Sequence, residues 1–171
     1  MAGMPAPVPK RIVLLTDGPS KSQEDLIRRF QKALEILAEG EIEPDFLKTR
    51  SAHWQKEKAA ALLRQTLQNP SVDLIFVNGP LLSTEALRVA QKGQKPVVGL
   101  FSFDPDVLLP ATPFNRLPVA LVVIPGQIEK DLQALRNIFK TRELTFLADG
   151  VLLEQFKGLK KTLLNAAKKQ G

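Results

Sequence analysis

The stretch Arg11-Ile12-Val13-Leu14-Leu15-Thr16-Asp17-Gly18 decides the fold of this chain, because a short apolar run leads directly into an acidic residue and a glycine. The same order recurs in Leu74–Gly79, which ends in Asn-Gly, and in Leu144–Gly150, which ends in Asp-Gly. An amphipathic segment follows each of these turns. Strand, tight turn and helix in this order form the repeating unit of a parallel sheet.

Predicted strands and helices alternate along the chain, and only the proline-containing stretch 104–118 interrupts them. Strict alternation predicts right-handed crossovers and a three-layer αβα fold around a mainly parallel, doubly wound sheet of about five strands. Pro44 predicts that the second strand lies at an edge, because proline cannot donate to the strand ladder. The expected strands are Arg11–Thr16, Glu41–Lys48, Asp73–Val77, Pro96–Phe103, Val119–Ile124 and Glu143–Ala148. The expected helices are one between Ser20 and Gly40, then Trp54–Gln68, Thr84–Gln91, Gln127–Phe139 and Leu152–Lys168.

Three parts are expected along the sequence. Residues 1–9, with two methionines and three prolines, are expected to be a disordered tag or linker. Residues 10–124 are expected to form a Rossmann-like lobe. Residues 125–171 would supply a crossover helix and either the start of a second lobe or the completion of the same sheet. The chain is therefore interpreted as a domain excised from a longer protein.

Composition excludes several classes of protein. The 171 residues contain no cysteine, which excludes disulfides, thiol nucleophiles and cysteine-bound metals. The net charge of +6 raises the question of nucleic acid, but the basic residues stand among acidic neighbours. Tyrosine is absent and Trp54 is the single tryptophan, so no platform for stacking bases is expected. No apolar run is long enough to span a membrane, so direct insertion of this chain is not expected.

The familiar catalytic and cofactor motifs are absent from the sequence. The turn after the first strand has one glycine and loses an N–H at Pro19, so it fits neither a phosphate loop nor a dinucleotide fingerprint. His53, the single histidine, precedes a helix and is interpreted as a residue of helix-entry packing or solvent contact, away from the carboxyl end of any strand. Ser20 and Ser83 lack a nucleophile elbow and are expected to cap helices. We therefore expect no cofactor, no metal and no catalytic residue.

Small polar groups instead gather where the predicted strands end. The carboxyl ends of parallel strands share one edge of the sheet, where such folds bind ligands. Capped helix N-termini offer N–H donors to an anionic group, and Asp17 and Asp104 would meet an ammonium or hydroxyls. The alternative is turn and cap chemistry with no ligand. The expected ligand-binding residues are Thr16, Asp17, Ser20, Asn78, Gly79, Ser83, Thr84, Ser102 and Asp104.

Several of these segments resemble a known family. Lys10–Ser20, Ser71–Pro80, Lys95–Val98 and Phe103-Asp104-Pro105 resemble, in that order, the first lobe of type I periplasmic binding proteins, in the branch related to ABC-transporter substrate-binding components. The Asp-Gly-Pro-Ser turn is more specifically similar to the amino-terminal region of some TolC-type outer-membrane efflux proteins. The resemblance covers most of residues 10–155.

The resemblance implies a function without catalysis. It implies a periplasmic sensor or interaction domain of a bacterial outer-membrane efflux or transport protein, whose partners are a small polar solute or other components of that complex. One alternative is the solute-binding lobe of an ABC-type uptake system for a small polar ligand. Another is a small α/β enzyme with Asp17 or Asp104 as its acid–base group. In the family, the loops at 16–20, 78–83 and 101–104 grip the ligand, and residues 143–169 would open the second lobe.

Overall fold

The computed structural model describes residues 9–38, 42–89, 95–102, 107, 118–123, 125–140, 143, 145 and 150–169. The predicted tag at residues 1–9 lies, except for Pro9, outside the described residues. The chain divides into two compact units, Met1–Ser102 with Phe114–Val122 and Phe103–Pro113 with Val123–Gly171. Among the described residues, no helix combines the length and the apolar character needed to cross a bilayer.

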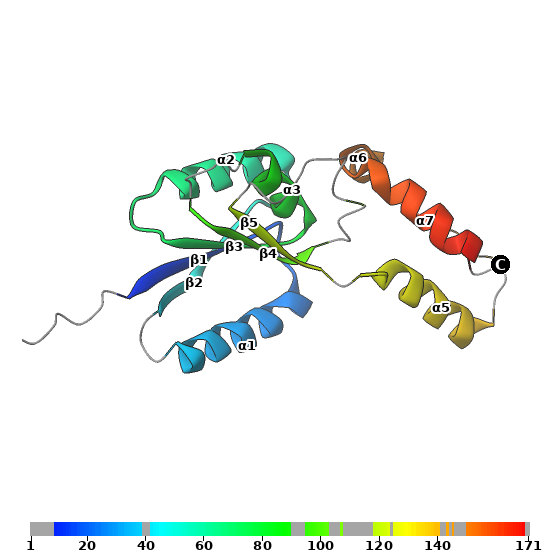
Figure 1. Cartoon of the computed structure of the whole chain (residues 1–171), viewed down its shortest axis with the longest axis horizontal. Coiled ribbons are helices and arrows are strands. Elements are labelled where there is room, and N and C mark those ends of the chain that lie inside the picture. Colours follow the sequence, from blue (N-terminus) through cyan, green and yellow to red (C-terminus); the bar gives the residue numbers. More distant parts are fainter. Residues whose placement is uncertain are drawn as a thin grey trace, which may run out of the picture. The chain divides into compact units, whose positions relative to one another are not determined.

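A five-stranded parallel sheet forms the centre of the first unit and confirms the predicted αβα fold (Figure 1). The order of its strands is β2-β1-β3-β4-β5, so the prediction of β2 as an edge strand is also confirmed. The strands are β1 (Lys10–Thr16), β2 (Ile42–Ser51), β3 (Leu74–Asn78), β4 (Val97–Ser102) and β5 (Val119–Val123). The helices between them are α1 (Lys21–Leu37), α2 (Lys56–Gln68) and α3 (Pro80–Val89).

The register of the strands brings their carboxyl ends to one edge. In the pairing of β1 with β3, Ile12 lies opposite Leu74 and Thr16 lies opposite Asn78. In the pairing of β1 with β2, Thr16 lies opposite Ser51, the last residue of β2. The predicted end of this strand at Lys48 is therefore wrong by three residues. The missed residues are polar, and an edge strand needs no continuous apolar run to mark its end.

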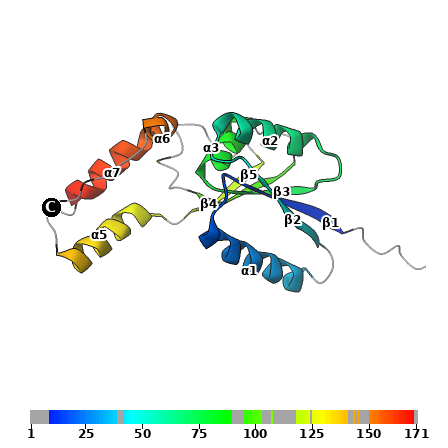
Figure 2. The same cartoon turned by 180° about the vertical axis from the view of Figure 1, so that it is seen from behind.

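Helices cover both faces of the sheet, with α1 on one face and α2 and α3 on the other (Figures 1 and 2). Alternate residues of a strand point to opposite faces. Leu14 and Phe76 point to the face of α1, where the rings of Phe30 and Phe76 meet edge to face with centroids 5.1 Å apart. The buried residues of this cluster are Ile12, Leu14, Phe76 and Leu100, and α1 contributes Ile27, Phe30 and Leu34.

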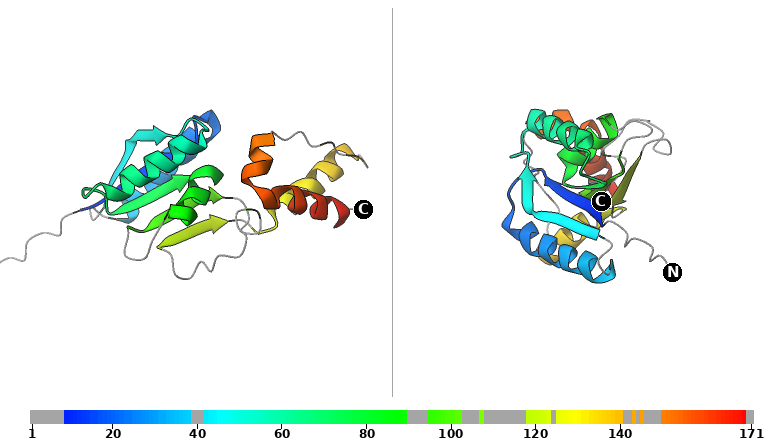
Figure 3. Two further views of the ribbon diagram at one scale, coloured as in Figure 1. Left: turned by 90° about the horizontal axis from the view of Figure 1, so that it is seen from above. Right: turned by 90° about the vertical axis from the view of Figure 1, so that its left-hand side faces the viewer.

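Among the described residues of the second unit are the helices α5 (Gln127–Phe139), α6 (Gly150–Gln155) and α7 (Lys157–Lys169) (Figure 3). Helices α5 and α7 pack together, and Lys169 of α7 forms an ion pair with Glu129 of α5. The prediction of one helix over Leu152–Lys168 is wrong, because Phe156 separates α6 from α7. Phe156 is buried and its carbonyl accepts the N–H of Leu159 at 2.8 Å, so burial of the ring outweighs continuation of the helix.

Other boundaries differ from the prediction or cannot be compared with it. Helix α3 begins at Pro80 rather than Thr84, because proline fits the first turn of a helix, where its missing N–H would be unpaired in any case. Of the predicted strand Glu143–Ala148, residues 144 and 146–148 lie outside the described residues.

The core of the first unit makes a prediction about stability. Leu14 is fully buried, so Leu14→Ala should lower the free energy of unfolding by about 2–5 kcal/mol through lost apolar burial and the cavity it leaves. The matched control is Leu37→Ala at the end of α1, where the side chain is 79% exposed. It should change stability by no more than about 0.5 kcal/mol. Urea denaturation followed by circular dichroism measures both, and equal losses would contradict the assigned core.

Candidate functional site

Backbone hydrogen bonds lock the carboxyl ends of neighbouring strands into one edge. The N–H of Asp17 donates to the carbonyl of Asn78 at 3.0 Å, and the N–H of Ala52 donates to the carbonyl of Thr16 at 2.9 Å. The N–H of Gly79 donates to the carbonyl of Leu100 at 3.3 Å. The turns that follow β1, β2 and β3 therefore begin side by side, as the sequence predicts for Thr16 and Asn78.

The side chain of Asp17 connects β1 to the start of α3. Its Oδ2 accepts the N–H of Leu81 at 2.7 Å, and its Oδ1 accepts the N–H of Leu82 at 2.8 Å. These two N–H groups belong to the first turn of the helix, where no carbonyl of the helix can accept them. A carboxylate is also the charge that the positive end of a helix prefers. Asp17 therefore caps α3 from a position 64 residues earlier in the chain.

Asp17 holds this position although it is almost completely buried, with 1% of its surface exposed. Burial disfavours the charged carboxylate and raises the pKa of Asp17 from 3.8 to about 6, while the two backbone N–H groups act in the opposite direction. Two opposing effects therefore determine the charge of this carboxyl group near neutral pH. The start of α3 favours the charged carboxylate, and burial favours the neutral form.

Gly79 is required by the same contact. Its φ of +120° lies in the region that residues with a Cβ rarely adopt. A Cβ at Gly79 would lie 2.4 Å from both the Cγ and the Oδ2 of Asp17. The glycine after β3 thus allows the turn and leaves room for the carboxylate.

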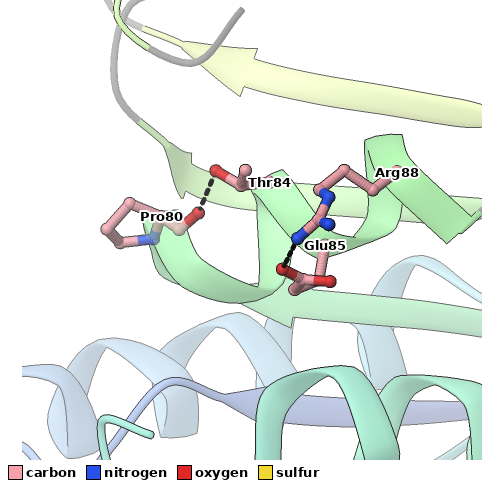
Figure 4. Close-up of polar contacts among 4 residues, drawn as sticks. All are labelled: Pro80, Thr84, Glu85 and Arg88. Carbon is pink, nitrogen blue, oxygen red and sulfur yellow. Dashed lines mark hydrogen bonds and ion pairs between the residues drawn. The ribbon is translucent and has the colours of Figure 1, made fainter. Parts of the chain in front are cut away.

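The predicted capping roles of the two serines have different outcomes. Ser20 occupies the position before α1, although its side chain forms no capping hydrogen bond. The prediction that Ser83 caps a helix is wrong, because Ser83 lies within α3 and its Oγ donates to the carbonyl of Gly79 at 2.8 Å. Thr84 Oγ1 likewise donates to the carbonyl of Pro80 at 2.8 Å (Figure 4). Asp17, and not a hydroxyl, takes the N–H groups that the sequence assigned to an anionic ligand.

The remaining predicted site residues are distributed as follows. Thr16, Asn78, Gly79 and Ser83 are buried, whereas Ser20 and Thr84 are half-buried. Ser102 ends β4, and Asp104 lies outside the described residues. The structure brings Thr16, Asp17, Asn78 and Gly79 together, and their role in binding a ligand stays a prediction. Among the described residues, no three His, Cys, Asp or Glu side chains are grouped so that they could hold a metal ion.

Two residues at this edge were missed by the sequence analysis. Because β2 ends at Ser51 and not at Lys48, His53 and Trp54 follow the carboxyl end of a strand. The interpretation of His53 as a residue away from any strand end is therefore wrong. Both residues have positive φ, 51° and 59°, so α2 begins at Lys56 and not at Trp54. The one signal in the sequence was a lone tryptophan beside a lone histidine in a polar segment.

Trp54 lies against the turn that follows β1. The backbone N–H of Trp54 donates to the carbonyl of Asp17 at 2.6 Å. The indole ring covers Gly18 so closely that a Cβ on Gly18 would lie 2.0 Å from Nε1. The side chain remains 54% exposed. An aromatic group therefore lies at this edge, on a segment that the sequence analysis did not assign to the site.

Known structures with this fold include binding proteins. The chain aligns over 96% of its length with an ABC domain in complex with L-Trp from Streptococcus pneumoniae, at a TM-score of 0.73 and 16% identity. It aligns over 95% with a conserved domain protein from Vibrio cholerae, at a TM-score of 0.72 and 15% identity. It aligns over 91% with a ligand-free, open substrate-binding protein with adhesive properties from Clostridium difficile, at a TM-score of 0.57 and 19% identity.

These similarities establish the fold as one that substrate-binding proteins adopt, as the resemblance in the sequence implies. The chain spans about half of each structure, 55%, 54% and 54% respectively. No family profile matches the sequence, and no curated protein matches it.

The raised pKa of Asp17 predicts an unusual dependence of stability on pH. The folded protein keeps the proton on the Asp17 carboxyl group up to about pH 6, whereas the unfolded chain keeps it only up to about pH 4. The stabilisation that comes from this protonated group is therefore fully present below pH 4 and is lost as the pH rises to 6. Relative to Asp17→Asn, the wild type should lose about 3 kcal/mol of unfolding free energy across this window. Urea denaturation at several pH values measures the difference.

Comparison with a variant is needed because Asp73 acts in the opposite sense. The backbone N–H of Arg11 donates to the carboxylate of Asp73 and lowers the pKa of Asp73. The stabilisation that comes from the Asp73 carboxylate is therefore lost as the pH falls. Asp25→Asn, on the exposed face of α1, is the control and should keep the wild-type profile. A wild type and an Asp17→Asn variant with parallel profiles would contradict the buried, titrating carboxyl group.

Gly79 gives a second prediction for this edge. Gly79→Ala should lower the unfolding free energy by roughly 2 kcal/mol or more, since it combines an unfavourable φ with a clash against Asp17. Gly150→Ala is the control, because a Cβ there meets no atom within 4 Å. In the Asp17→Ala background, Gly79→Ala should lower the unfolding free energy by a smaller amount, because the carboxylate that clashes with the new Cβ is absent. Thermal denaturation of the four variants tests this coupling.

Proposed function

We propose that this chain is a solute-binding lobe, which holds a small polar ligand at the carboxyl edge of its sheet and does not transform it. The observation that carries the proposal is the alignment of Thr16, Ser51 and Asn78 at one edge, fixed by hydrogen bonds between the turns. In open parallel sheets, ligands bind outside the carboxyl ends of the strands.

The similar structures support this choice over the other interpretations. One of them contains bound L-Trp and another is a substrate-binding protein, whereas none of them is described as an efflux protein. The first interpretation, a sensor domain of an outer-membrane efflux protein, therefore has less support than the solute-binding alternative. By the same likeness, we propose an ABC-type uptake system as its partner and a periplasmic or otherwise exported location.

The environment of Asp17 favours binding over catalysis. A general acid or base must reach the proton that it transfers. Both carboxylate oxygens of Asp17 accept N–H groups of α3, and the side chain is buried. Asp17 therefore serves the structure of the edge, and exposed groups around it would contact the solute. Since the chain spans about half of the similar structures, a second lobe would complete the grip on the ligand.

A panel of amino acids, sugars and nucleobases tests the proposal by thermal shift and calorimetry. A true ligand present at a hundredfold excess over its Kd should stabilise the fold by about 2.7 kcal/mol. Ser20→Arg, which places a long side chain at the carboxyl edge, should abolish the shift without unfolding the protein, because Ser20 is only half-buried and precedes α1 instead of lying within it. Ser71→Arg, an exposed position before β3 at the opposite edge, is the matched control. Binding that survives Ser20→Arg, or no binding at all, would contradict the proposal.

A further inference from the structure

We propose that Trp54 is the stacking platform of the ligand site, and that the solute carries an uncharged planar aromatic ring that lies against the exposed face of the indole. The inference rests on the proposed function, because it names the chemical class of the solute and the residue that recognises it. Four features of the segment around Trp54 support it.

The first feature is that the backbone holds Trp54 in place before any ligand arrives. Its N–H donates to the carbonyl of Asp17 at 2.6 Å, and the next N–H, of Gln55, donates to the carbonyl of Ala52 at 3.0 Å. The preceding N–H, of His53, donates to Ser51 Oγ at 3.1 Å. Three consecutive N–H groups are thus bonded within the edge, which is the preorganisation that makes a contact favourable for binding.

The second feature is the left-handed backbone conformation that these hydrogen bonds hold. Both His53 and Trp54 have left-handed φ values, which are unfavourable for residues that carry a Cβ. Such conformations persist only where the surrounding structure fixes them, and they cluster at functional sites. Burial compensates little here, because 54% of the Trp54 side chain is exposed. The conformation keeps the indole at the rim instead of in the core.

The third feature is the orientation of the ring. The site where Gly18 would carry a Cβ lies 2.0, 2.2 and 2.3 Å from Nε1, Cε2 and Cδ1, three atoms of the five-membered ring. Nearly equal distances to three bonded ring atoms mean that the indole turns its face, not its edge, toward Gly18. One face therefore covers the backbone of Gly18, and the opposite face points away from it.

The fourth feature is the charge next to Trp54. An indole face binds planar rings by stacking, and it binds cations through its quadrupole. Along the segment 50–57, the charged side chains are those of Arg50, Lys56 and Glu57, with positive charge in excess. The carboxylate of Asp17 is buried against α3 and does not offset this excess. A cation is therefore disfavoured, and of the two kinds of group that an indole face binds, a planar ring without positive charge remains.

The protein reports on this contact directly, because Trp54 is its single tryptophan and it has no tyrosine. The probes are phenylalanine, uracil, adenine and benzamide, with leucine and glucose as non-aromatic comparators. At least one aromatic probe should change the tryptophan emission saturably and shield it from acrylamide quenching about twofold or more. The comparators should do neither.

Variants then separate stacking from other contributions, with affinity measured by calorimetry. Trp54→Leu should weaken binding of the aromatic probe about tenfold or more, and Trp54→Phe should keep it within about threefold. Phe139→Leu is the matched control, an exposed aromatic residue of α5 whose loss should leave the affinity unchanged. Circular dichroism checks that each variant is folded, and acrylamide protection in the wild type provides the test if Trp54→Leu does not fold.

Each remaining outcome overturns a defined statement. Aromatic binding that is equally tight in Trp54→Leu overturns the role of Trp54. Binding of leucine or glucose in preference to every aromatic probe overturns the ligand class. Either result leaves the solute-binding function intact. Absence of binding by any compound of this set and of the larger panel overturns the proposed function together with this inference.

Discussion

A buried carboxylate bonded to the first turn of a helix organises the carboxyl edge of the sheet in this protein. The Asp17 side chain accepts two N–H groups of α3, its backbone N–H donates to β3, and its carbonyl accepts the N–H of Trp54. One residue thus joins β1, β3, α3 and the turn after β2. Since a buried charge without partners would be very unfavourable, these contacts must form together. The shape of the edge follows from that requirement.

This arrangement determines which groups of the edge are available to a ligand. In many α/β folds the start of a helix is left open for an anionic ligand. Here the protein fills the start of α3 with its own carboxylate, so the proposed ligand would be recognised by other groups. The exposed indole of Trp54, placed over Gly18, is the largest such group among the described residues of this edge. The proposed recognition therefore depends on an aromatic surface and not on a helix dipole.

The fold could be predicted from the sequence more completely than the site. The near-continuous apolar run at Leu74–Val77 identifies a strand buried on both faces, and Pro44 identifies the edge. The contacts of Asp17 were not visible, because they join residues 64 positions apart and no local pattern encodes such pairing. Trp54 was missed for a related reason. The polar end of β2 has no apolar alternation, so its three extra residues, and with them the edge position of Trp54, emerge only from pairing with β1.

The long edge strand β2 has a further consequence for the behaviour of the chain at high concentration. An edge strand offers unpaired backbone groups to which a strand from another molecule can add. Two features make β2 a poor template: its pairing with β1 shifts register between Val13 and Leu15, and Pro44 has no N–H to donate. Irregular edges of this kind discourage the addition of a strand from a second molecule, which lowers the tendency of the chain to aggregate at high concentration.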